Sequence, residues 1–182
     1  MPAPQSSSWI TGRELGSWIR SFDLSGIRQP AEIPRAVRDL ASTVDCMLSS
    51  DLPRSVQSAA ALLPSGQYYL VKPELREAPL PQTLGIRIRA PAAWWIVIAR
   101  FVWWLNLRDA EESVVYTQLR ARGVANQLGT LAAQHGSVLV VGHGFFNSLL
   151  ARALHARGWA GPRIPPSNYW SIAIYTLHSS SD

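Results

Sequence analysis

A histidine flanked by two glycines directly follows a short apolar run in the last third of the chain. The run Val138–Val141 is a continuous series of β-branched and aliphatic residues, which is typical of a strand buried on both faces. Gly142-His143-Gly144 interrupts it, and apolar residues then recur at helical spacing from Phe145 to Leu154. The sequence therefore predicts a strand, a turn and a helix, with His143 where open α/β sheets bind ligands and where helix N–H groups can hold an anion. A histidine in that place can bind or protonate a phosphate.

Gly-His-Gly alone is a weak motif, because a histidine in a turn can be purely structural. Two other strand ends add to it: Arg54 follows a predicted strand at 44–50, and Glu77 lies in the loop after a predicted strand at 67–71. A guanidinium grips phosphate oxygens, and a glutamic acid can protonate a leaving oxygen. Arg54 could instead form a surface ion pair, and Glu77 could be a solvated loop charge. Because all three follow strand ends, we expect Arg54, Glu77 and His143 to meet at one anion pocket.

The elements that must position these side chains alternate between helix and strand. The predicted helices are 11–22, which starts with a Thr11–Glu14 capping box, 35–43, 53–63, a tryptophan-rich stretch within 86–107, 110–134 and 145–154; the predicted strands are 44–50, 67–71, 138–141 and 171–177. This order predicts an α/β fold, a three-layer sandwich with a mostly parallel central sheet flanked by helices. We expect a single domain over residues 1–182, in which 78–110 is a tryptophan-rich insertion or cap segment.

The insertion carries four tryptophans, at 94, 95, 103 and 104. We place all four close to one face of a helix, where they could pack on the sheet, pair with a second subunit or touch a membrane surface. The basic polar face that membrane binding needs is thin here. Core packing or a subunit contact is therefore favoured, and a homodimer through Trp94–Trp104 is one expectation.

The composition excludes several classes of protein. The chain of 182 residues is 47% hydrophobic and 16% charged, which predicts a folded domain rather than a disordered one. Its net charge of +5 comes from scattered basic residues without a nucleic-acid motif. We therefore expect an anionic small-molecule ligand and no nucleic acid.

Cofactor and membrane segments are not expected either. Cys46 is the only cysteine, so neither an intrachain disulfide nor a cysteine zinc site can form. We see no metal-ligand spacing and expect neither a metal nor a cofactor. The first residues lack a signal-peptide pattern, and the apolar stretch 92–107 is interrupted by Arg100 and too short to span a bilayer. These features favour a cytoplasmic protein.

Three segments of the chain carry a resemblance to a known family. They are Leu48–Ala59, Glu74–Glu77 and Val138–Leu150. In these segments the chain resembles the histidine phosphatase superfamily, also called phosphoglycerate mutase-like, and the likeness extends from about Trp9 onward. Members of that family hydrolyse phosphomonoesters through a phosphohistidine and need no metal.

The resemblance also implies roles for individual residues. It assigns phosphate binding to Arg54, with His143 and Gly144 completing the pocket, and proton donation to Glu77. Glu112, at the start of the long helix, is a second candidate for the acid.

One motif of the family has no counterpart here. Its nucleophile is a histidine in an Arg-His-Gly motif after the first strand, whereas the four histidines of this chain are His135, His143, His155 and His178. A phosphohistidine mechanism needs a nucleophilic imidazole opposite the leaving group, and His143 already has another role. We therefore expect the chain as written to be inactive, or to be a truncated family member. The alternative is a non-catalytic module for phosphate binding or self-association.

The family's first strand is missing together with this motif, and its loss would leave open sheet edges. Three explanations stay open: a wrong start or truncation, closure of the gap by the remaining strands, or a partner strand, which a second copy could supply. The capping-box helix directly after the missing piece favours truncation.

Overall fold

The computed structural model of the protein describes residues 7–27, 32–63 and 68–177. Its helices are α1 (Leu15–Asp23), α2 (Arg35–Ala41), α3 (Pro53–Leu62), α4 (Ala92–Trp104), α5 (Val114–His135) and α6 (Gly144–His155), with a short 3-10 helix η1 (Pro73–Leu75). Its strands are β1 (Trp9–Thr11), β2 (Cys46–Ser49), β3 (Leu70–Val71), β4 (Arg89–Pro91) and β5 (Val138–Val141). The predicted helices all form, with somewhat different bounds. The short strands β1 and β4 were not predicted.

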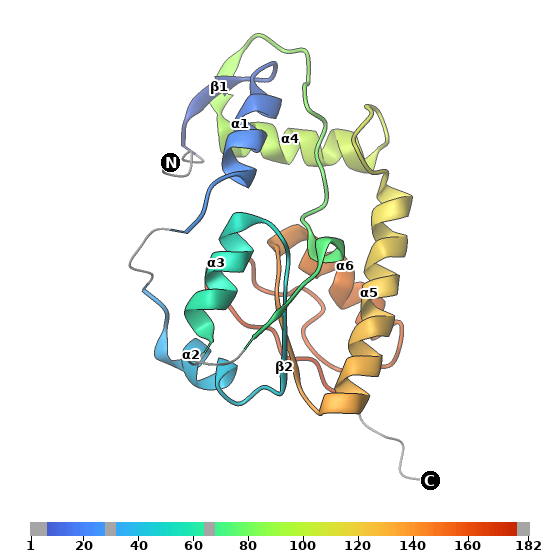
Figure 1. Ribbon diagram of the computed structural model, residues 1–182. Helices are drawn as coiled ribbons and strands as arrows, with labels where there is room; N and C mark the ends of the chain where they lie inside the picture. The colour runs from blue at the N-terminus through green and yellow to red at the C-terminus, as the bar shows by residue number, and fades with distance from the viewer. Residues whose placement is uncertain (1–6, 28–31, 64–67, 178–182) are drawn as a thin grey trace.

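A parallel sheet of order β3-β2-β5 forms the centre of the larger half of the molecule (Figure 1). Adjacent residues of β2 point to opposite faces of this sheet. Leu48 packs into a cluster with residues of α5 and α6, whereas Met47 packs with residues of α2 and α3. Helices therefore cover both faces, which confirms the predicted α/β architecture with a parallel sheet between helical layers.

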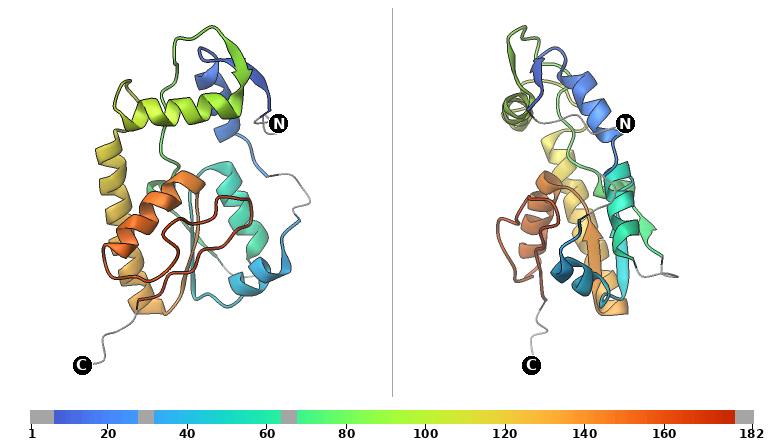
Figure 2. Two further views of the ribbon diagram at one scale, coloured as in Figure 1. Left: turned by 180° about the vertical axis from the view of Figure 1, so that it is seen from behind. Right: turned by 90° about the vertical axis from the view of Figure 1, so that its left-hand side faces the viewer.

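The remaining elements form a second group above this sheet, which we call the cap (β1, α1, β4 and α4). β1 and β4 pair antiparallel, and Figure 2 shows the cap as a separate layer at one end of the molecule. Its own apolar cluster contains Leu15, Leu80, Leu84, Trp95 and Ala99. Only one half of the predicted capping box forms. The Glu14 carboxylate accepts from the Thr11 N–H at 2.7 Å, but the Thr11 hydroxyl donates to the same carboxylate instead of accepting from a helix N–H.

The prediction that all four tryptophans share one face of the helix is wrong. Trp95 and Trp103 are buried at 3% and 2% exposure, whereas Trp94 is 67% exposed and Trp104 is 41% exposed. Consecutive residues of an α-helix lie about 100° apart around its axis, so each neighbouring pair straddles the boundary between core and solvent. In the part of the chain that the structure describes, no helix is long and apolar enough to cross a membrane.

The predicted final strand at 171–177 does not form. Its one ladder contact is an isolated bridge between Thr176 and Ala160, and Tyr175 packs against the α5–α6 cluster instead. Alternation of apolar and polar residues shows that one face of a segment is buried, and it does not specify which partner strand is available. In the described sheet β5 is an edge strand, and its four residues are only half-buried, so the prediction of burial on both faces is wrong as well.

Candidate functional site

The carboxyl ends of β2 and β5 bring a histidine and two serines together. Ser49 pairs with Val141 in the parallel register, so both strands end at the same level of the sheet. The residues that follow are therefore neighbours, and His143 Nε2 lies 2.9 Å from Ser50 Oγ and 3.3 Å from Ser55 Oγ. All three side chains are buried. The sequence predicted the place of His143 and missed its hydroxyl partners, although Ser50 directly follows the predicted strand.

Burial keeps the His143 imidazole neutral. The pKa of His143 is lowered from 6.5 to about 3, first by burial and then by the nearby Arg54 and Arg120 charges, whereas Asp51 acts in the opposite direction. A neutral imidazole offers one N–H donor and one acceptor. At neutral pH His143 can therefore exchange hydrogen bonds with a ligand but supplies no positive charge of its own.

The guanidinium of Arg54 is held by helix α1 of the cap. Arg54 lies in the first turn of α3, and its Nη1 donates to Asp23 Oδ1 at 3.0 Å. The guanidinium also lies 4.7 Å from the ring centroid of Phe22. Only 16% of the Arg54 side chain is exposed. The structure thus places Arg54 near His143, as the sequence predicted, and pairs it with a carboxylate that the sequence did not indicate.

Glu77 caps helix α6, whose N-cap residue is His143. Its carboxylate oxygens accept hydrogen bonds from the N–H groups of Phe145 at 3.1 Å and Phe146 at 2.8 Å. These are N–H groups of the first helical turn that have no partner within the helix. Gly144 begins the same helix, and a Cβ there would come within 3.2 Å of Ser167 Cβ. Glu77 and Gly144 therefore both lie at the start of α6, where the Glu77 carboxylate already accepts from two of the free N–H groups.

Glu112, the second candidate for the acid, is fully engaged with Arg120. Arg120 donates from Nε and Nη2 to the two carboxylate oxygens at 2.8 and 2.7 Å, and the Thr117 hydroxyl donates to the same group at 2.9 Å. Arg120 Nη1 also donates to the carbonyls of Glu74 and Arg76 at 2.6 and 3.0 Å. Arg120 therefore positions the loop that carries Glu77. Sequence reasoning missed it, because this arginine looks like any surface charge of a long helix.

Two more arginines surround the site. Arg76 forms a bidentate pair with Asp51, with N–O distances of 2.7 and 2.6 Å, and this pair lowers the pKa of Asp51. Arg100 of α4 donates to the carbonyls of Ala78 and Pro79, and its guanidinium lies 4.0 Å from the Phe145 ring centroid. Burial lowers the pKa of Arg100. Arg76 thus pairs with the residue that follows Ser50, and Arg100 brings a cation of the cap against the start of α6.

The other histidines lie away from this site or outside the described residues. His135 is the last residue of α5 and His155 is the last residue of α6, whereas His178 is not among the described residues. Among the histidines that the structure describes, His143 alone lies at the carboxyl ends of β2 and β5. Within the described ranges, no group of three or more His, Cys, Asp or Glu side chains is placed to hold a metal ion.

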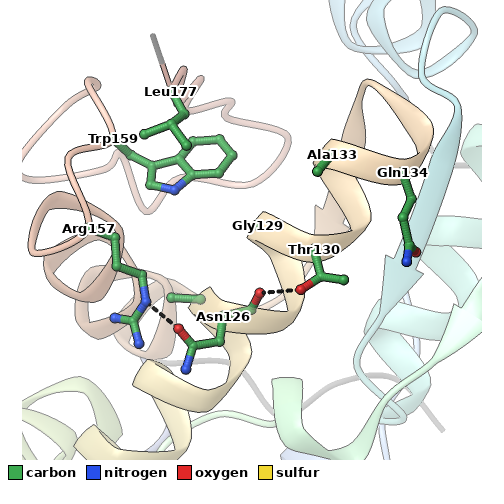
Figure 3. A pocket seen from close by; sticks show the side chains of 9 residues that line it. Asn126, Gly129, Thr130, Ala133, Gln134, Arg157, Trp159 and Leu177 are labelled. Carbon is green, nitrogen blue, oxygen red and sulfur yellow. Dashed lines mark hydrogen bonds between the residues drawn. The ribbon is translucent and has the colours of Figure 1, made fainter. Parts of the chain in front are cut away.

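A shallow hollow of about 610 Å³ lies along α5, on a different part of the molecule (Figure 3). Arg157 is the charged residue in its lining, and its guanidinium donates to Asn126 Oδ1 and to the carbonyls of Ala153 and Arg122. Neither His143 nor Arg54 nor Glu77 lines this hollow. It is therefore unrelated to the site at the strand ends.

Fold and site together define an α/β protein with a buried histidine and several arginines at the carboxyl ends of parallel strands. The sequence model of the histidine phosphatase superfamily (branch 1) matches residues 22–181, which is most of the chain. The chain therefore belongs to the histidine phosphatase superfamily, and the resemblance seen in the sequence is confirmed. No curated protein and no solved structure matches the chain.

Proposed function

We propose that the chain binds a small phosphorylated molecule between His143 and Arg54, and that its 182 residues do not by themselves hydrolyse it through a phosphohistidine. The observation that carries the proposal is the environment of His143: a buried imidazole at the start of a helix, with the charges of Arg54 and Arg120 close enough to lower its pKa. Such an environment disfavours a cation and favours an anion.

A bound phosphate would place a negative charge next to Arg54 and His143. The anion would compete with Asp23 for Arg54 and with the hydroxyls of Ser50 and Ser55 for His143. A negative charge beside the imidazole favours its protonated form. We therefore expect phosphate binding to be coupled to proton uptake by His143. The N–H of Gly144, at the start of α6, is the backbone donor that we propose for the anion.

Glu77 is the proton donor that we propose for any turnover by a complete family member, because its carboxylate lies at the start of α6, the helix whose N-cap residue is His143. In the present arrangement it would have to release the N–H groups of Phe145 and Phe146 before it could protonate a leaving oxygen. A phosphohistidine also needs a second imidazole in line with the leaving group. No other described histidine lies at this site.

Titration calorimetry with inorganic phosphate tests the binding, run in two buffers of different ionisation enthalpy so that proton uptake is also measured. We expect millimolar or tighter binding by the wild type, at least a tenfold loss in Arg54→Ala and loss of proton uptake in His143→Gln. Arg35→Ala is the matched control, because the Arg35 side chain is 93% exposed and lies on α2. Unchanged binding in Arg54→Ala would overturn the site.

The same preparations are assayed for hydrolysis of p-nitrophenyl phosphate. We expect no turnover above that of His143→Ala. A second preparation, extended at its N-terminus by a strand that ends in Arg-His-Gly, should gain activity. Robust turnover by the 182-residue chain that disappears in His143→Ala would disprove the non-catalytic part of the proposal while leaving the binding site intact.

A further inference from the structure

Helix α4 has two apolar faces, of which the structure covers one. Its buried residues are Ala92, Trp95, Ala99 and Trp103. The opposite face is the outer stripe, which consists of exposed apolar residues at helical spacing, Trp94, Val97, Ile98, Phe101 and Trp104, and continues into Leu105 just after the helix. Figure 2, in its right-hand view, looks almost along α4 and shows it at the outside of the cap. A helix that is apolar all round is normally covered on all sides.

The size of the outer stripe fits a protein interface. Trp94, Val97 and Phe101 are 67%, 55% and 66% exposed, and Leu105 is 62% exposed. With large apolar side chains of roughly 150–250 Å² each, the six residues present on the order of 600 Å² of apolar surface. This is at the upper end of the largest patch on a monomer, about 300–600 Å², and close to the area of about 800 Å² that each partner buries in a standard interface.

The charges beyond the two ends of α4 have opposite signs. Exposed Arg87 and Arg89 precede the helix, whereas exposed Asp109 and Glu111 follow it. Arg108 also follows the helix, but its guanidinium lies against Gly85, 3.5 Å from the position of a Cβ there. No residue of the stripe itself is charged, because Arg100, the one charged residue of α4, donates to carbonyls on the inner side. The guanidinium of Arg152, from α6, lies 5.7 Å from the ring centroid of Trp104 at the acidic end of the stripe.

This polarity selects one occupant and one orientation. If two α4 helices pack antiparallel across a twofold axis, the arginines of one copy meet the acidic residues of the other, and the same patch serves both partners. A parallel pair would bring like charges together. An anionic membrane would meet the acidic end as well as the basic end, which costs electrostatic free energy.

We infer that the outer stripe of α4 is the interface of a homodimer, in which two copies pack antiparallel with Ile98 and Phe101 nearest the twofold axis. The contact uses none of the residues that we propose for phosphate binding. Arg100, on the inner side of the same helix, lies against the Phe145 ring, so the dimer would also brace the cap over the start of α6.

Sedimentation velocity over a wide concentration range tests the interface. We expect a dimer for the wild type and a monomer for Phe101→Asp, which places a charge at the centre of the stripe. Ile164→Asp is the matched control and should remain dimeric, because Ile164 is 86% exposed and is not part of the outer stripe. Both variants should keep the wild-type circular dichroism and the wild-type phosphate binding. A wild type that stays monomeric at every concentration would overturn the inference. If that monomer also bound phosphatidylserine vesicles and Phe101→Asp abolished this binding, the stripe would be a membrane contact instead.

Charge reversal tests the orientation. Arg87→Glu combined with Arg89→Glu should raise the dimer dissociation constant by roughly fivefold to tenfold, because like charges then face each other. Adding Asp109→Arg and Glu111→Arg to the same chain should restore the wild-type value. If the variant with all four substitutions dimerises no more tightly than the variant with two, the antiparallel arrangement is wrong.

Discussion

At the scale of single residues, the site is a set of charges that already have partners. Arg54 pairs with Asp23, Arg120 with Glu112 and Arg76 with Asp51, and Glu77 accepts hydrogen bonds from helix N–H groups. His143 is the exception, since its partners are the neutral hydroxyls of Ser50 and Ser55. Its protonation state is therefore the property of the site that responds most directly to pH and to a bound anion.

Stability should fall in acid because of His143. Its pKa is about 3 in the folded protein and 6.5 in its unperturbed state, so between these pH values the unfolded chain binds a proton that the folded chain does not. Its contribution is fully present above pH 6.5 and is lost as the pH falls towards 3, by up to about 1.4 kcal/mol per pH unit. We expect urea unfolding between pH 7 and pH 4.5 to show a smaller slope for His143→Gln than for the wild type. His135→Gln is the control, and equal slopes for all three proteins would refute the assignment.

At the scale of elements, helix α6 depends on a carboxylate from a distant loop. Its N-cap residue is His143, whose side chain makes no capping hydrogen bond, and Glu77 supplies the acceptors instead. A negative charge at a helix N-terminus also interacts favourably with the helix dipole. Glu77 is therefore a structural residue of α6, whatever part it has in proton transfer.

Glu77→Ala should lower the free energy of unfolding by about 2 kcal/mol, because two charge-assisted hydrogen bonds to a half-buried helix start are lost. Glu74→Ala is the matched control, since the Glu74 side chain is exposed and only its carbonyl accepts from Arg120. Urea denaturation measures both variants, and hydrogen exchange at the Phe145 and Phe146 amides should speed up in Glu77→Ala alone. Equal losses of stability in the two variants would contradict the capping role.

The sequence was most informative where local pattern and fold logic agree. That Arg54, Glu77 and His143 follow strands of one parallel sheet could be predicted, because such strands end at one edge of the sheet. That the three side chains share an anion pocket stays a prediction. The contributions of Asp23 and Arg120 could not be predicted, because these residues come from α1 and α5. The sequence does not show whether a charged residue of a helix faces the site or the solvent. The roles that the family resemblance gives to Arg54, Glu77, Gly144 and His143 stay predictions.

The errors have equally local causes. Trp94 and Trp95 were placed on one face although a single helical step separates a buried position from an exposed one. The segment 171–177 has the alternation of a strand, but alternation does not identify a partner, and its Thr176 bridges to Ala160 instead.

At the scale of the whole molecule, the cap and the sheet meet through charged contacts. Asp23 at the end of α1 holds Arg54 of α3, and Arg100 of α4 reaches the Phe145 ring of α6. The first contact uses the guanidinium that we propose for phosphate. Ligand binding and the attachment of α1 are therefore competing uses of one side chain.

Asp23→Asn should increase phosphate affinity by roughly fivefold, because it removes the anion that competes for Arg54 and whose ion pair is worth about 1 kcal/mol. Asp39→Asn is the matched control, since Asp39 pairs with Arg35 on the exposed surface of α2. Titration calorimetry with phosphate compares the two. Weaker binding in Asp23→Asn would show that Asp23 orients Arg54 for the ligand rather than occupying it.

Arg120 has a further consequence for how the molecule can open. Its three nitrogens are spent on the Glu112 carboxylate and on the carbonyls of Glu74 and Arg76, and its guanidinium also lies 4.2 Å from the ring centroid of Phe146. One side chain thereby connects α5, the Glu77 loop and α6. None of these three segments can shift without breaking a charged hydrogen bond or a cation–π contact of Arg120. We therefore expect the movement that admits a ligand to involve α1, which is held to Arg54 through Asp23.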